Sequence, residues 1–273
     1  MDDSAFLSQV LAAPSDDAPR LVWADALQEK GDPRGEFIQV QCQLARGAPN
    51  RQALQGRARA LLNTHERDWS ADLVKVYGPV KCVFVRGFIE EVTLPAAKFL
   101  KKPAPLLGGT VRRIQLAEVD PKICARLALC EELDRVRELD LRQNRIGVHG
   151  MMALAGSKHL AHLELLDLGD TRRGDGGLKA LAACDLSGLR ALYLWSNGIH
   201  DEGIKSLVAS ASLKKLAKLV LSGNPITEVS VDSLLQAKGL PALREVKLEG
   251  TRIPFARVEA LREELGRRPA TGA

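Results

Sequence analysis

The sequence predicts an α/β solenoid with an all-helical cap domain before it, and three observations support this fold class. The pattern L-x-x-L-x-x-L-x-L-x-x-N/T starts 26 or 27 residues apart, at Leu133, Leu160, Leu186, Leu213 and Leu240. A further aliphatic series keeps the same interval, at Met151, Leu178, Ile204, Val231 and Val258. Residues 1–80 lack this pattern. A repeat of this length is typical of solenoids, in which each unit buries its apolar face against its neighbours.

Residues 1–80 are predicted to form a small helical domain. One helix begins at Asp17-Ala18-Pro19, because a proline in the first turn costs no hydrogen bond, and Gly31 ends it. Asp32-Pro33 begin the next helix in the same way. More helix is expected to about Leu62, with a last turn around Trp69.

The rest of the chain divides into three parts. In residues 81–132 the aliphatic spacing survives without the asparagine, so this segment is predicted to hold two degenerate capping repeats. Residues 133–265 hold five regular repeats, which gives about seven repeats in all. Residues 266–273 have nothing apolar to bury, and we expect this tail to be disordered.

Each repeat predicts one strand, one turn and one helix. In L-x-L the two leucines point into the core and the residue between them points out, since side chains alternate along a strand. The asparagine can satisfy neighbouring backbone groups from both ends of its amide, which threonine can do only in part. The sequence then continues as in Ile199–Leu207, where Ile204 and Leu207 share one helix face.

This array resembles leucine-rich repeats of the ribonuclease-inhibitor-like subtype. The resemblance implies a parallel sheet on the concave side and helices on the convex side. The front run, WADALQEKGDPRGEFIQVQCQLA at 23–45, resembles a bacterial "repeat-companion" domain that commonly precedes such repeats. That family implies no catalytic residue.

Composition narrows the function further. The net charge of +5 comes from residues 81–130, where no nucleic-acid motif or aromatic cluster accompanies the lysines and arginines, so no nucleic-acid partner is expected. No stretch has the length and apolarity of a membrane span. The first residues are acidic and unlike a secretory signal. The five scattered cysteines read as reduced, buried thiols, and we expect a cytoplasmic monomer.

No motif for chemistry is present, so the sequence predicts that the protein is not an enzyme and needs no cofactor. His159 and His162 have a spacing that metal ligands use, but no third ligand is near them in sequence, and no metal site is expected. Asp25, Asp32 and Glu36 fit helix caps and ion pairs better than a carboxylate site.

The positions facing out from the strands locate a candidate surface. Leu165, Tyr193, Trp195 and Val220 come together in the middle of the predicted sheet, bordered by Asp140, Asp167 and Arg142. Tyr193 and Trp195 alternate with buried leucines, so we expect both rings to be exposed on the concave face. The open alternative is that the rings cover each other or pack on the floor of the curve.

The predicted function is a non-catalytic interaction module that binds a protein partner on its concave face, because exposed aromatics with a charged rim are usual in protein interfaces. The turn at 169–177 adds Arg172 and Arg173 to the candidate surface, since Arg173 replaces the isoleucine of the other repeats. The alternative is a regulator of an enzyme, either an inhibitor or a GTPase activator, which the resemblance implies.

Overall fold

The computed structural model describes residues 3–107, 109–172 and 174–268, and these form two compact units. The first unit comprises the residues before Thr93 together with Ala104–Arg112. The second comprises Thr93–Pro103 and the chain from Arg113 onward. Of the tail expected to be disordered, residues 269–273 lie outside the described residues.

The first unit is mainly helical. Its elements are α1 (Asp3–Ala12), α2 (Ala18–Glu29), α3 (Pro33–Ala45), α4 (Arg51–Trp69), α5 (Ala71–Tyr77), β1 (Lys81–Val85), most of β2 (Phe88–Pro95) and α7 (Ala104–Leu107). Asp32 caps α3 as predicted, since its Oδ1 accepts the N–H of Arg34 at 2.8 Å. Asp17 does not cap α2 through its side chain, because its carboxylate binds Arg46 and Arg86 instead.

The strand β1 was not predicted, and it belongs to a hairpin that packs against the helices. Arg86 and Gly87 form its two-residue turn, and both have positive φ angles (49° and 89°). A Cβ at Gly87 would overlap Ile38 of α3. The hairpin therefore approaches α3 so closely that only glycine fits at this position.

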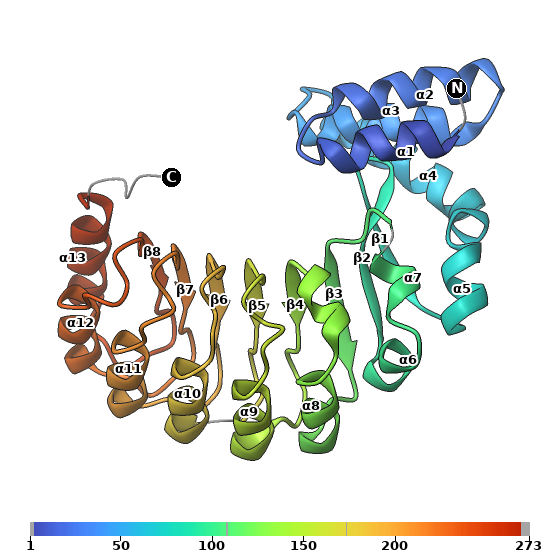
Figure 1. The fold of residues 1–273 in the computed structure, drawn as a ribbon. Helices are drawn as coiled ribbons and strands as arrows, with labels where there is room; N and C mark the ends of the chain where they lie inside the picture. The colour runs from blue at the N-terminus through green and yellow to red at the C-terminus, as the bar shows by residue number, and fades with distance from the viewer. Residues whose placement is uncertain (1–2, 108, 173, 269–273) are drawn as a thin grey trace. The chain divides into compact units, whose positions relative to one another are not determined.

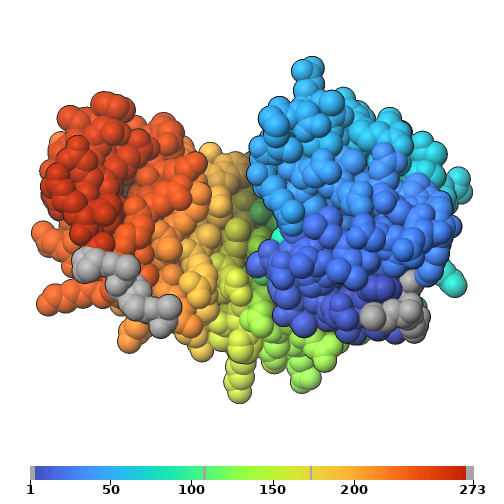
Figure 2. Space-filling model, turned by 90° about the horizontal axis from the view of Figure 1, so that it is seen from above, coloured from blue at the N-terminus to red at the C-terminus, as the bar shows by residue number. Residues whose placement is uncertain are grey.

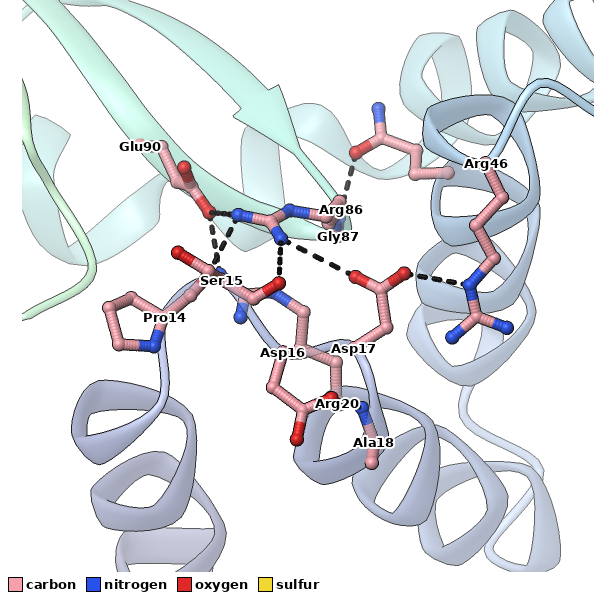
Figure 3. Close-up of polar contacts among 11 residues, drawn as sticks. Pro14, Ser15, Asp16, Asp17, Ala18, Arg20, Arg46, Arg86, Gly87 and Glu90 are labelled. Atoms are coloured by element: carbon pink, nitrogen blue, oxygen red, sulfur yellow. Dashed lines mark hydrogen bonds and ion pairs between the residues drawn. The ribbon is translucent and has the colours of Figure 1, made fainter. Parts of the chain in front are cut away.

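Arg86 ties the same hairpin to the connection between α1 and α2 (Figure 3). Its guanidinium donates to the carbonyls of Pro14 at 2.8 Å and Ser15 at 3.1 Å. Glu90 of β2 accepts from the fully buried Arg20 of α2 at 2.6 Å. These charge-assisted hydrogen bonds fix how α1, α2 and the hairpin pack within the unit.

The second unit is the repeat array. Its strands are the end of β2, β3 (Arg113–Ala117), β4 (Glu138–Asp140), β5 (Leu165–Asp167), β6 (Ala191–Tyr193), β7 (Lys218–Val220) and β8 (Glu245–Lys247). Its helices are α6 (Ala96–Lys101), α8 (Pro121–Leu127), a 3₁₀ turn (Glu131–Arg135), α9 (Gly147–Ala155), α10 (Gly174–Ala182), α11 (Asp201–Val208), α12 (Glu228–Leu235) and α13 (Phe255–Gly266).

From β3 to β8 the strands lie in chain order and each is parallel to the next. The strands line the inner side of the array and the helices lie outside, and successive repeats are side by side (Figures 1 and 2). Leu166 pairs in register with Leu139 and Leu192. All ten predicted core residues are buried: Leu139, Leu141, Leu166, Leu168, Leu192, Leu194, Leu219, Leu221, Val246 and Leu248. The predicted fold class and register are therefore confirmed.

The turn asparagines bind the repeats to one another. The Nδ2 of Asn197 donates to its own strand at Leu194 O (3.0 Å) and to the preceding repeat at Leu168 O (2.9 Å). Its Oδ1 accepts the N–H of Thr171 at 2.9 Å. Asn144 makes the same kinds of contact two repeats before, and Asn224 makes them one repeat after. Each buried amide thus satisfies backbone groups of two repeats.

The residue before each turn asparagine or threonine has a left-handed backbone. This holds for Gln143, Asp170, Ser196, Gly223 and Gly250, with φ between 50° and 70°, and Glu118, which stands at the same position before Val119, has a φ of 60°. Four of the six are not glycine, so the turn imposes a conformation that these side chains rarely adopt. The buried hydrogen bonds at the next position offset that cost.

Replacing Asn197 should be costly because the amide serves two repeats. In Asn197→Ala, several buried backbone groups lose their partner, at about 1–3 kcal/mol for each. We expect the free energy of unfolding in urea to fall by about 3 kcal/mol. Asn197→Thr, which places at 197 the residue found at 171, should lose clearly less. Equal losses in the two variants would show that the amide bonds are not what stabilises this turn.

Removing residues 1–80 should leave an unstable product. Phe84 packs against Phe37 and Trp69, with ring centroids 5.7 and 6.1 Å away, and Phe88 packs against Trp23 at 5.3 Å. The truncation would expose both phenylalanines, so we expect the remaining fragment to aggregate in size-exclusion chromatography. A monodisperse fragment with one cooperative unfolding transition would contradict this expectation.

Candidate functional site

The candidate site is the concave face of the second unit, which consists of the outward residues of β3 to β8. Leu165, Tyr193 and Trp195 are half-buried there, and Val220 is only 7% exposed. We call these four residues the central patch. In the strand register Tyr193 lies beside Val220, and Leu165 pairs with Ala191, two residues before Tyr193.

The two rings are less exposed than expected. A Cβ added at Gly169 would overlap the indole of Trp195, so this ring lies across Gly169 on the neighbouring strand. The ring of Tyr193 has the Nζ of Lys218 at 6.0 Å from its centroid. The alternative that the rings pack on the floor of the curve is therefore correct for Trp195. Gly169 permits this packing of the Trp195 ring, because it has no side chain. The position of Gly169 beside Trp195 in the repeat alignment is the sequence feature that could have indicated it.

Asp140 and Asp167 were expected at an accessible border, and this was wrong. Asp140 is 0% exposed and Asp167 is 3% exposed. Two arginines bind the Oδ2 of Asp140: Arg113 Nη2 at 2.9 Å and Arg142 Nε at 3.2 Å. The carboxylates therefore lie in the floor of the face, while the side chain of Arg142 remains 40% exposed.

Arg113 is a member of this face that the candidate residues did not include. It reaches Asp140 from β3, and its Nη2 is 4.0 Å from the Oδ2 of Asp167. No motif marked Arg113 as a candidate, because β3 belongs to a degenerate repeat without the turn asparagine. Only the pairing of β3 with β4 places this guanidinium over the carboxylates.

Burial raises the pKa of the Asp167 carboxyl, and the neighbouring charge of Asp140 raises it further. The N–H of Gly169, at 2.9 Å from Oδ1, acts in the opposite direction, as do the charges of Arg142 and Arg113. The ionised carboxylate of Asp167 is therefore less well stabilised here than in water.

The two arginines of the candidate surface lie in the loop at 169–177. Arg172 is exposed, with a φ of 55°, and Arg173 lies outside the described residues.

His159, from the candidate metal pair, binds Asp134 through Nδ1 at 3.1 Å. Within the described parts of the chain, no cluster of three metal-ligating side chains occurs. Glu36 forms an ion pair with Arg57.

The opposite end of the face carries a second group of charges. Lys218 Nζ binds Glu245 Oε1 at 2.8 Å, and Ser222 Oγ donates to Glu249 at 2.8 Å. Arg262 of α13 also reaches Glu249, at 3.1 Å. The central patch thus separates a carboxylate-rich floor at β4 and β5 from a mixed-charge end at β7 and β8.

The effect of the raised pKa of Asp167 on folding stability can be measured. A carboxyl whose pKa is higher in the folded than in the unfolded state destabilises the fold once both states are ionised. Asp167→Asn should therefore raise the melting temperature at pH 7. This advantage should fade as the pH falls through the raised pKa, because wild-type Asp167 then becomes neutral. A variant that is less stable at pH 7 and equal at low pH would show that the charge of Asp167 is stabilising.

Comparison with known proteins agrees with this geometry. A family model for leucine-rich repeats matches residues 136–155, 159–182 and 189–208. No curated protein matches the chain. None of the helices in the described residues is both long enough and apolar enough to span a membrane.

Several solved structures are similar at low identity. An internalin from Listeria monocytogenes is 18% identical, with 68% of this chain and 48% of that chain covered and a TM-score of 0.41. The C-terminal domain of a Caenorhabditis elegans tropomodulin is 16% identical, with 55% and 93% covered and a TM-score of 0.42. A leiomodin-1 actin-binding site 2 structure is 15% identical, with 62% and 87% covered and a TM-score of 0.32. The chain spans about half the length of the internalin.

The family match falls on units from β4 to α11, where buried leucines and turn asparagines recur in space at the interval seen in the sequence. The repeat array of this chain is therefore a leucine-rich-repeat solenoid.

Proposed function

We propose that the protein is a non-catalytic interaction module that binds a protein partner on the concave face of its repeat array. The observation that carries this proposal is the central patch, where two aromatic rings and two aliphatic side chains lie together with charged groups on both sides. Aromatic residues surrounded by a polar rim are the usual composition of a protein-binding hot spot.

The size and rigidity of the face support the same proposal. Six strands at about 4.8 Å spacing give a face roughly 25 Å long, enough for an interface of about 800 Å² per partner. The buried leucines and turn amides hold the strands in a fixed register, so the patch is organised before a partner arrives. Less ordering on binding leaves more of the interaction energy for affinity. If the partner is an enzyme, binding here would also regulate it.

Several further expectations belong to this proposal. The carboxylate contacts of Arg113 support the view that the basic segment is not a nucleic-acid track. Five buried, unpaired cysteines support a cytoplasmic location, where thiols stay reduced. We also infer that the first unit is a bacterial repeat-companion domain, since the resembling run at 23–45 contains the capped start of α3. A single chain is the proposed functional unit.

Trp195→Ala should weaken partner binding by about 2 kcal/mol, some thirtyfold in Kd. The partner would first be captured with the intact chain and identified, and the affinity then measured by titration calorimetry. Because the ring also covers Gly169, we expect a loss of about 1 kcal/mol in folding stability, well short of unfolding.

Two further variants control this experiment. Gly169→Ala keeps the indole but forces it out of its position, so it should weaken binding as well. Phe255→Ala removes an aromatic ring that is 77% exposed at the start of α13, and it should leave the affinity unchanged. An affinity that survives Trp195→Ala, or falls equally in Phe255→Ala, would refute the central patch as the binding surface.

A further inference from the structure

The outer side of the repeat array divides into a basic half and an acidic half. The helices α6, α8, α9 and α10 carry five basic residues and one acidic residue, a net charge of +4: Lys98, Lys101, Lys122, Arg126, Lys179 and Asp175. The helices α11, α12 and α13 carry three basic and seven acidic residues, a net charge of −4: Lys205, Arg257, Arg262, Asp201, Glu202, Glu228, Asp232, Glu259, Glu263 and Glu264. The two halves therefore favour partners of opposite charge.

The basic residues of the two halves also differ in their ion pairs. In the acidic half each basic residue binds a carboxylate of the same half: Lys205 to Glu202, Arg262 to Glu259 and Arg257 to Asp232. In the basic half, Lys122, Arg126 and Lys179 are exposed and take part in no ion pair among the described residues. These three cations can therefore bind an acidic partner without first giving up an existing pair.

An apolar helix lies between these cations. The helix α9 is placed between α8 and α10 on the outside of the array (Figure 1), and it contains no Asp, Glu, Lys or Arg. Its inner residues Met151 and Leu154 are buried, whereas on its outer side Met152 is 60% exposed and Val148 is 37% exposed. A helix that is apolar on all sides is normally covered on all sides. The outer side of α9 therefore has the composition of a contact surface.

Close packing brings the basic residues beside this apolar side. A Cβ at Gly150 of α9 would lie 3.4 Å from the Cα of Pro121 in α8, and a Cβ at Gly176 of α10 would lie 3.5 Å from both methyl groups of Val148. The residues that directly follow the equivalent buried positions Cys124, Met151 and Leu178 form one outward row across the three helices: Ala125, Met152 and Lys179. Met152 is thus the apolar centre of the row, with cations on the helices at both sides.

We propose that Lys122, Arg126, Val148, Met152 and Lys179 form a second docking surface, which binds an acidic amphipathic helix of a protein partner. We call these five residues the convex patch. It lies on the helical side of the sheet and is separate from the central patch. The cations select carboxylates, and the two apolar side chains select an apolar stripe between them.

The shape of the convex patch favours a helix as the bound element. Val148 and Met152 are one helical turn apart, so they form a ridge along α9 of the kind that packs into the groove of a second helix. Surfaces that bind membranes usually insert aromatic and large apolar side chains. The helices α8, α9 and α10 contain no Phe, Tyr or Trp, so the composition favours a protein over a lipid surface.

The test uses a phage-displayed library of designed helices about 20 residues long, with leucines along one side and random residues elsewhere. The library is selected on the intact chain, and helices that also bind the Met152→Gln variant are removed. We expect the remaining helices to carry more Asp and Glu than Lys and Arg beside the leucines. Their affinity, measured by fluorescence anisotropy, should fall as the salt concentration rises.

Matched variants then locate the contact. Lys179→Gln should weaken the selected helix about fivefold, because the lysine loses no partner of its own and the helix loses one. Lys205→Gln, at the equivalent position of α11, should leave the affinity unchanged, since Lys205 is paired with Glu202. Val229→Gln removes an apolar side chain that is 50% exposed on α12 and should also have no effect. Melting curves establish that each variant is folded.

The Trp195→Ala variant should bind the selected helix as tightly as the wild type, so failure here and failure of the central patch are distinguishable. The proposal is overturned if no helix depends on Met152, if the selected helices are not acidic, or if Lys205→Gln weakens them as much as Lys179→Gln. Sedimentation with phosphatidylglycerol vesicles that Met152→Gln abolishes would assign the convex patch to a membrane instead. A dimer that Met152→Gln dissociates in analytical ultracentrifugation would assign it to a second copy of the chain.

Discussion

The buried amide at each turn is the interaction on which the array depends. A strand of three residues has few hydrogen bonds of its own, so the stacking of repeats needs a second connection. Asn197 provides it by binding the backbone of its own strand and of the preceding one. Because Asn144 and Asn224 do the same, adjacent repeats share one register. That register decides which side chains become neighbours on the concave face.

The concave face shows how a fixed register can accommodate an unfavourable charge. Asp140 and Asp167 are placed side by side on parallel strands, where two ionised carboxylates repel each other. Arg113 and Arg142 compensate Asp140, but Asp167 keeps a raised pKa.

In the first unit, close packing and polar contacts explain a sequence run that might otherwise suggest chemistry. Gly35, in the first turn of α3, lies against the backbone of α2, with room for no side chain between them. Gly87 permits an equally close approach of the hairpin to α3. Asp17, directly before α2, makes no side-chain cap and instead binds Arg46 and Arg86. Asp25, Asp32 and Glu36 of this run each bind a partner within the unit.

The sequence alone determined the strands, the buried leucines and the turn residues of the repeats, because the pattern that specifies them is contained within each repeat and recurs in the next. It also placed Tyr193 and Trp195 on the outward side of β6, since alternation along a strand needs no knowledge of the neighbours. Only the tertiary structure showed that Trp195 lies over Gly169 and that Asp140 is buried beneath arginines. Those features depend on side chains that cross from one strand to the next, one of them Arg113 from a repeat whose pattern is degraded. Exposure on a curved sheet is decided by such crossings, and no spacing within a single strand encodes them.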